Sequence, residues 1–274
     1  MASRYRRSCS CLLVLGAGLG QFSLGLHGQT GSNQPLTWRP FLRHLKEDQK
    51  NIWLSPFRVN RQDAKWWLVF GSATAALMAT DHWTSRQLPN TQHQINVSSI
   101  PSRFGAGYTV FPAALACYAI GARQRDERLR ETGLVGAEAL ANVYVVTNAL
   151  KVATWRERPL EGDGSGRFWK GSGRLWNEGA SFPSGHSAQI WALASVVAHE
   201  YPRPRIVPVA AYGVATTVLV SRFTQRRHFA SDVVAGAAIG WFIGDYVYHK
   251  RHNRSLELPR SKFGGVLSKV GFGP

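Results

Sequence analysis

Six apolar segments, rich in glycine and alanine, make up most of the chain beyond residue 65. They cover residues 66–80, 104–122, 132–150, 187–198, 206–221 and 233–248. Small residues are common where helices pack closely against one another. The segments therefore predict an all-α fold, a helical bundle with a six-helix core that is embedded in a membrane.

The sequence leaves a soluble bundle open as the alternative to a membrane bundle. Several segments are shorter than the ~20 residues that a perpendicular span needs. The mean hydropathy of -0.19 is too polar for a transporter made almost wholly of spans. Trp66, Trp67, Trp241 and Tyr246 lie near segment ends, however, and such aromatic residues gather at membrane interfaces. We therefore favour tilted or short membrane helices.

The regions outside the six segments predict three further parts of the chain. Residues 1–28 carry Arg4, Arg6 and Arg7 before an apolar stretch, which predicts a signal peptide or an N-terminal anchor. Residues 29–65 form a polar or interfacial segment, residues 66–250 the helical domain, and residues 251–274 a basic tail.

The charge of the chain limits its binding partners. Thirty-three basic residues against sixteen acidic ones give a formal net charge of +17, which suits nucleic acid, an anionic membrane or a phosphorylated ligand. The charge is spread over several loops, and no nucleic-acid motif is present, so we expect a membrane and a phosphorylated ligand. The three cysteines have no metal-ligand or disulfide spacing, and no metal or cofactor is expected.

A first polar block follows the third apolar segment. Lys151 closes that segment, and Arg158 comes seven residues later, directly before Pro159. The proline ends the helix at this point. Taken alone, such a basic pair is usually a cap that reaches toward solvent.

A second block, from Ser181 to His186, opens the fourth segment. Its Pro-Ser-Gly-His run predicts a tight turn into a helix, and the free amides at a helix start favour an anion. Ser184 could also be an ordinary N-cap residue. His186 alone could be a hydrogen-bonded core histidine or a functional one.

A third block links the fifth segment to the sixth. His228 and Asp232 are four residues apart, so on a helix they would share one face and could hydrogen-bond. A carboxylate on one imidazole nitrogen would leave the other nitrogen as a nucleophile. Arg222 lies six residues before His228 and alone would be an ordinary cation at a helix end.

The bundle topology places these three blocks close together. In an up-down bundle, the end of the third segment, the start of the fourth and the link from the fifth to the sixth share one side. Three cations, two histidines and a helix start would therefore converge. This combination predicts a phosphate site with its own nucleophile and acid.

The three blocks resemble the signature of the type 2 phosphatidic acid phosphatase and vanadium haloperoxidase superfamily. The matching patterns are Lys-x6-Arg-Pro, Pro-Ser-Gly-His and Ser-Arg-x5-His-x3-Asp. The resemblance covers roughly residues 66–250. It implies a helical bundle and, in the phosphatase branch, hydrolysis of phosphate monoesters or lipid pyrophosphates without a metal.

The resemblance also implies a role for each matching residue. Phosphate binding falls to Lys151, Arg158, Arg222, Ser184 and Gly185. His228 would attack phosphorus with Asp232 orienting it, and His186 would protonate the leaving oxygen and later activate water. Fixed cations suit this reaction because they stabilise the charge on the equatorial oxygens.

The leading hypothesis is thus a membrane phosphatase that acts on a lipid phosphate or pyrophosphate, with the oligomeric state left open. The alternatives are a secreted acid phosphatase of broad specificity, a vanadate-dependent haloperoxidase and a non-catalytic membrane scaffold. The aromatic residues in the loop 160–180 predict that this loop lies over the pocket and contacts the non-phosphate part of the substrate.

The basic loops also predict an orientation. The loop 123–130, the turn 201–205 and the tail 250–269 would lie opposite the site, and basic loops stay in the cytoplasm. The site would then face the periplasm from the bacterial inner membrane. Six spans would leave the residues before Trp66 in the cytoplasm, whereas a cleaved signal peptide would place them outside, so the number of spans stays open.

Overall fold

The computed structural model describes residues 38–58, 61–171 and 180–256, and these residues form helices and loops without any strand. The eight α-helices are α1 (Trp38–Leu54), α2 (Arg61–Arg86), α3 (Gln92–Ser102), α4 (Gly107–Gln124), α5 (Glu127–Thr154), α6 (Gly185–Glu200), α7 (Ile206–Thr224) and α8 (Ala230–Arg251). There are also three short 3-10 turns. Two of them, η1 (Ser55–Phe57) and η2 (Arg103–Gly105), directly continue α1 and α3, and η3 (Arg254–Leu256) follows α8 after a gap of two residues. The predicted all-α fold is confirmed.

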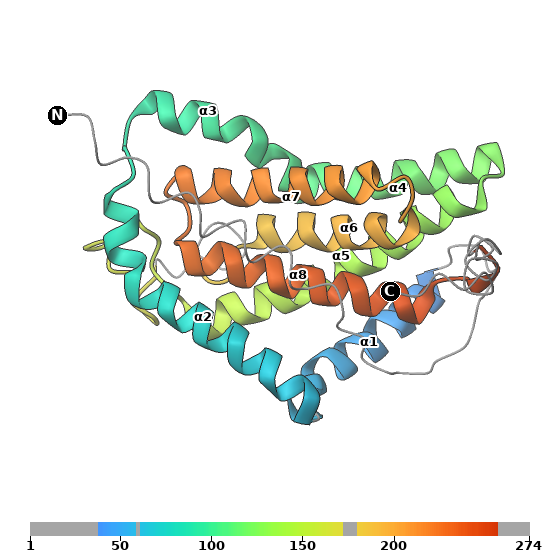
Figure 1. Ribbon diagram of the computed structural model, residues 1–274, viewed down its shortest axis with the longest axis horizontal. Coiled ribbons are helices and arrows are strands. Elements are labelled where there is room, and N and C mark those ends of the chain that lie inside the picture. Colours follow the sequence, from blue (N-terminus) through green and yellow to red (C-terminus); the bar gives the residue numbers. More distant parts are fainter. Residues whose placement is uncertain (1–37, 59–60, 172–179, 257–274) are drawn as a thin grey trace, which may run out of the picture.

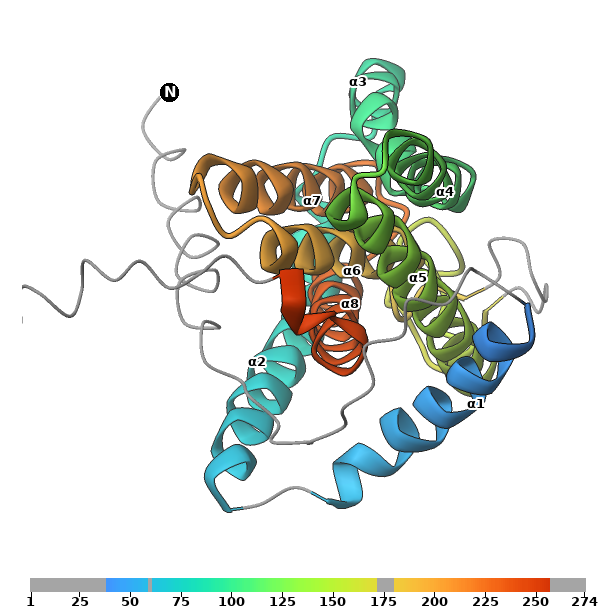
Figure 2. The same ribbon diagram turned by 90° about the vertical axis from the view of Figure 1, so that its right-hand side faces the viewer.

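Helix α6 lies at the centre of the bundle. It packs against α5, α7 and α8, while α4 covers α5, α3 covers α7, α2 covers α8 and α1 covers α5 (Figures 1 and 2). The six predicted segments fall in α2 and in α4 to α8. The N-terminal prediction for residues 1–28 and most of the basic tail lie outside the described residues.

A stripe of three glycines lets α8 approach α6 closely. A Cβ atom at Gly236 would clash with the backbone carbonyl oxygen of the α6 N-cap residue, and Cβ atoms at Gly240 and Gly244 would clash with carbonyl oxygens within α6. These glycines are four residues apart and therefore lie on one face of α8. The stripe holds the start of α8 against the start of α6, where the second and third blocks meet.

Replacing Gly240 with alanine should destabilise the protein by about 1–3 kcal/mol, the usual cost of overpacking. The new methyl group meets the carbonyl oxygen of Ala188, and backbone atoms cannot rotate away. Gly213 in α7 is the matched control, because a Cβ atom there would meet nothing within 4 Å. Gly213→Ala should leave stability unchanged or raise it by up to about 1 kcal/mol. Equal unfolding free energies for the two variants in detergent would contradict the close contact.

Helix α3 was not predicted, because its sequence QHQINVSSIPS shows no apolar periodicity. The helix begins at a Thr91 N-cap whose side chain accepts a hydrogen bond from the Gln94 amide. It then packs on α7 through polar contacts. The Thr224 hydroxyl donates to Ser98 Oγ at 2.8 Å. Polar packing of this kind leaves no hydrophobic pattern in the sequence.

Three helical stretches are long and apolar enough to cross a membrane by length and composition, namely Gln92–Gln124, Glu127–Thr154 and Ile206–Thr224. Only 28% of the most apolar window is buried in the first and third stretches. Large apolar side chains such as Leu115, Ile206 and Val209 are accordingly exposed. Because such faces suit lipid, we regard the bundle as a membrane bundle.

A buried carboxylate ties α1 to the rest of the bundle. Asp48 is fully buried and accepts hydrogen bonds from Lys250 at 2.6 Å and from Arg251 at 3.0 Å. Arg251 also pairs with Glu138, at 2.9 Å. This pairing explains how an acidic residue can interrupt the apolar segment of α5.

Candidate active site

The structure brings the three predicted blocks together at one end of the bundle. They lie where α5 ends, where α6 begins and where α7 leads into α8 (Figure 1). The Ser184 amide donates to the Asp232 carbonyl at 3.0 Å, which joins the second block to the third. The basic turn between α4 and α5, the turn between α6 and α7 and the end of α8 lie at the opposite end (Figure 1).

Two of the predicted phosphate-binding cations lie beside the other blocks. Lys151 Nζ donates to the Ala180 carbonyl at 2.8 Å. The Cε atom of Lys151 would lie 3.9 Å from a Cβ atom placed on Gly185. Arg158 is buried and donates to the Arg227 carbonyl at 3.1 Å. Lys151 is thus next to the start of α6, and Arg158 is next to the residue before His228.

Arg222 in the last turn of α7 is held by α3. Its Nη1 donates to Ser102 Oγ at 2.8 Å and to Gln225 Oε1 at 3.2 Å. The Gln225 amide in turn donates to the Ser98 carbonyl. The unpredicted helix α3 therefore fixes the orientation of a predicted site residue.

Ser184 lies at the N-cap position of α6 but does not cap the helix with its side chain. Its hydroxyl instead accepts a hydrogen bond from Ser187 Oγ at 3.1 Å. Gly185 and His186 follow as the first two residues of the helix. The first amides of α6, together with the helix dipole, therefore favour an anion at this point.

The His228 ring donates its hydrogen bond to the Ser181 carbonyl and not to Asp232, which was the expected acceptor. Its Nδ1 lies 2.7 Å from the Ser181 carbonyl oxygen, and only a protonated nitrogen can donate to a carbonyl. The nearest Asp232 oxygen is 3.9 Å from Nδ1, which is too far for a hydrogen bond. With Nδ1 protonated, the Nε2 of neutral His228 carries the lone pair.

The expected direct hydrogen bond between His228 and Asp232 does not form, because α8 begins only at Ala230, and the role of Asp232 in orienting His228 stays a prediction. His228 therefore precedes the helix, and the i,i+4 geometry does not apply to this pair. Asp232 lies in the first helical turn, where its carboxylate accepts a hydrogen bond from the Phe229 amide at 2.9 Å. It also accepts one from Ser181 Oγ. Asp232 thus acts on His228 through Ser181.

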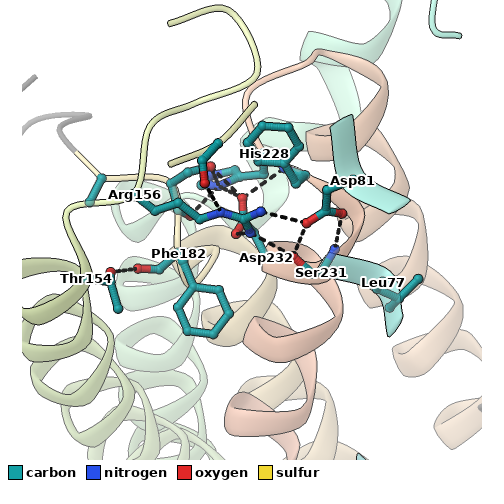
Figure 3. A network of polar contacts seen from close by, with 12 residues as sticks. Leu77, Asp81, Thr154, Arg156, Phe182, His228, Ser231 and Asp232 are labelled. Atoms are coloured by element: carbon teal, nitrogen blue, oxygen red, sulfur yellow. Dashed lines mark hydrogen bonds and ion pairs between the residues drawn. The ribbon is translucent and has the colours of Figure 1, made fainter. Parts of the chain in front are cut away.

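Arg156 and Asp81 complete the site and were missed by the sequence analysis. Arg156 Nη1 donates to Asp232 Oδ1 at 2.6 Å, and Nη2 donates to Asp81 Oδ2 at 2.8 Å (Figure 3). Ser231 bonds both Arg156 and Asp81. All four side chains are buried. Arg156 lies two residues before Arg158 in the first block, and this position could have identified it as a site residue. Nothing in the sequence around Asp81 indicated its contact with Arg156.

Two aromatic rings enclose the Arg156 guanidinium. Its Cζ lies 4.5 Å from the centroid of the Phe229 ring and 5.1 Å from that of Phe168. Phe168 belongs to the loop 160–180, of which residues 172–179 lie outside the described part of the chain. The described half of the loop thus packs on the buried network, and substrate contact by this loop stays a prediction.

Both site histidines are neutral at physiological pH, and both lie outside the three candidate spans. Burial lowers the pKa of His186 from 6.5 to about 3, and the charges of Arg222, Lys151 and Arg158 act in the same direction. Burial also lowers the pKa of His228 well below its usual range, and the same three cations contribute. The charges of the same three cations therefore act on both histidines.

The depressed pKa of His186 predicts a loss of stability in acid. Unfolded histidine titrates near pH 6.5, so between about pH 6.5 and pH 3 the unfolded chain binds more protons than the folded protein. The free energy of unfolding therefore falls as the pH falls through this window. His186→Gln removes the titrating group. Its melting temperature should fall less steeply than that of the wild type between about pH 7 and pH 4, and equal slopes would contradict the assignment.

Comparison with known proteins connects this site to one family. Residues 133–256, which contain all eight predicted site residues, match the sequence model of the PAP2 superfamily. A lipid A 1-phosphatase of Porphyromonas gingivalis is 42% identical over 80 residues, 28% of this chain and 18% of that protein. A lipid A 1-phosphatase of Rhizobium etli is 37% identical over 101 residues, 36% of this chain and 41% of that protein. The chain therefore spans less than half the length of either relative.

A solved structure shares the fold. The crystal structure of a transmembrane PAP2-type phosphatidylglycerolphosphate phosphatase from Bacillus subtilis superposes with a TM-score of 0.55 at 20% identity. The match covers 73% of this chain and 100% of that protein. It supports the helical bundle as the architecture of this chain.

Proposed function

We propose that the chain is a phosphatase that removes a phosphate group from a lipid, because its residues 133–256 match the PAP2 superfamily. The observation that carries the proposal is the convergence of three cations on two neutral histidines. Such a pocket binds a phosphate group and stabilises the charge of its transition state. No step of the proposed reaction needs a metal ion.

His228 is the nucleophile in this proposal. Its Nδ1 proton is donated to the Ser181 carbonyl, so the lone pair on Nε2 attacks phosphorus. The bond from phosphorus to the lipid oxygen breaks as the bond to nitrogen forms, which gives a phosphohistidine. Lys151, Arg158 and Arg222 bind the phosphate oxygens, and Ser184 Oγ and the Gly185 amide add hydrogen bonds.

His186 is the general acid and base. Its pKa is low in the free protein partly because of the three cations, and a bound phosphate dianion compensates these charges. His186 then gains a proton, which it gives to the leaving lipid oxygen. Neutral again, it takes a proton from a water molecule that attacks the phosphohistidine and releases inorganic phosphate.

The proposed substrate is a phosphorylated lipid, and the 1-phosphate of lipid A is the first candidate because two relatives carry that name. The exposed apolar faces of the bundle suit a substrate presented by a membrane. We propose that the site faces the periplasm from the inner membrane, because the basic turns lie at the opposite end.

A phosphate-release assay in detergent with EDTA tests this proposal. The substrates are lipid A, phosphatidic acid, phosphatidylglycerol phosphate and undecaprenyl pyrophosphate. We expect turnover of lipid A with the phosphate lost from position 1, and loss of that turnover in His186→Ala. Absence of release from all four lipids, or release that needs an added divalent metal, would contradict the proposal.

A further inference from the structure

Two carboxylates and one imidazole meet at the end of the bundle opposite the active site. Glu131 belongs to the start of α5, Glu200 ends α6, and His252 directly follows α8. His252 Nδ1 lies 2.7 Å from Glu131 Oε1 and 3.4 Å from Glu200 Oε1. One ligand atom from each residue lies within 4.8 Å of the other two. Glu200 is fourteen residues from His186 along α6, which places the group about 21 Å from the active site.

Glu200 is the unusual member of this group. The residue is 2% exposed, and within the described part of the chain neither carboxylate oxygen has a hydrogen-bond partner. The Nε2 of His252 is also buried without a partner there. An ionised carboxylate that has left water needs a compensating charge or hydrogen bond. The single ion pair that reaches Glu200 among the described residues comes from His252, which is shared with Glu131.

We propose that Glu131, Glu200 and His252 bind one divalent transition-metal ion. When the ion binds, His252 releases its second proton to solvent, and the two carboxylates and the neutral imidazole then carry a charge of −2, which the ion neutralises. Mixed nitrogen and oxygen ligands suit Zn²⁺ or Mn²⁺, whereas Mg²⁺ and Ca²⁺ prefer oxygen ligands. The ion joins the ends of α5, α6 and α8 and has no part in the phosphatase reaction.

A neighbouring group offers similar ligand types but is satisfied without a metal. His199 Nε2 and His249 Nδ1 lie 3.2 and 3.3 Å from the same oxygen of Asp245. The other ring nitrogen of His199, Nδ1, bonds the Ser195 carbonyl at 2.7 Å. This second group therefore serves as an internal control for the first.

The test uses full-length protein without a histidine tag, purified in detergent and stripped with EDTA. After dialysis against Zn²⁺ or Mn²⁺, we expect one bound equivalent per chain by elemental analysis. We also expect a melting temperature higher by about 5 °C at saturation, because a ligand that binds only the folded state stabilises it. Mg²⁺ should give neither effect.

Glu200→Gln, which keeps the size of the side chain, should weaken Zn²⁺ binding by more than about 100-fold, because even indirect partners of a metal contribute 10–100-fold. His252→Gln provides a second variant should the first fail to fold. Asp245→Asn, in the neighbouring group, and His228→Ala, in the active site, should retain the metal.

Two results would overturn the proposal. The first is wild-type protein that retains no stoichiometric Zn²⁺ or Mn²⁺. The second is a Glu200→Gln variant that binds metal as the wild type does. If no metal binds and Glu200→Gln is more stable than the wild type, a protonated Glu200 occupies the cluster instead. These readouts do not depend on phosphatase activity, so the two proposals fail separately.

Discussion

Replacing His228 with alanine should lower phosphate release by about 10⁴-fold or more, the scale seen when a catalytic nucleophile is removed. The expected loss follows from the position of the imidazole. Its Nδ1 donates a hydrogen bond to the Ser181 carbonyl, and the charges of three cations act on the ring. No other group in the proposed reaction can take over the attack on phosphorus. The measurement is the initial rate of phosphate release in detergent with EDTA.

Two controls separate lost chemistry from lost structure. His228→Asn can still donate a hydrogen bond to Ser181 but lacks the nucleophile, so it should be as inactive as His228→Ala while melting closer to the wild type. His93 in α3 is exposed, and His93→Ala should change the rate by less than about twofold, as most surface substitutions do. Substantial activity in His228→Asn would contradict the assignment.

Replacing Arg156 with alanine should destabilise the protein by about 3–5 kcal/mol, the usual cost of breaking a buried ion pair. Arg156 is 2% exposed and pairs with two buried carboxylates, Asp81 and Asp232. Its loss leaves both carboxylates without this cation. Denaturant unfolding in detergent micelles measures the change in free energy.

The matched control is Arg130→Ala, which removes an arginine from a half-exposed i,i+3 pair with Glu127. Such pairs contribute about 0–1 kcal/mol, so the two variants should differ clearly. Arg156→Lys keeps the charge but not the planar guanidinium that bonds two partners. It should fold better than Arg156→Ala and still lose activity, with a lower kcat at nearly unchanged KM. Equal stability of Arg156→Ala and Arg130→Ala would contradict the network.

Much of the helical core could be predicted from the sequence because it is built from apolar segments. The segments at 132–150 and 233–248 lie within α5 and α8, and the predicted bundle was confirmed. The helix α3 could not be found in this way, because it packs through Ser98 and Ser102 and not through an apolar face. Hydrophobic periodicity detects helices only where apolar packing positions them.

In the candidate site, too, some residues could be predicted from the sequence and some contacts could not. Short spaced motifs predicted Lys151, Arg158 and Arg222, since cations at helix ends leave a pattern in the sequence. The expected direct hydrogen bond between His228 and Asp232 does not form, because a spacing of four residues does not reveal that α8 begins after the histidine. The contact between Arg156 and Asp81 joins residues 75 positions apart, and no local pattern encodes such a distance.

Trapping of the covalent intermediate tests the central claim most directly. Purified protein would be mixed briefly with a labelled lipid phosphate in the presence of EDTA, denatured at alkaline pH to preserve phosphohistidine, and digested for mass spectrometry. We expect a phosphoryl group on His228 in the wild type and none in His228→Ala. A phosphoryl group on a different residue, or phosphate release by His228→Ala at the wild-type rate, would contradict the proposed mechanism.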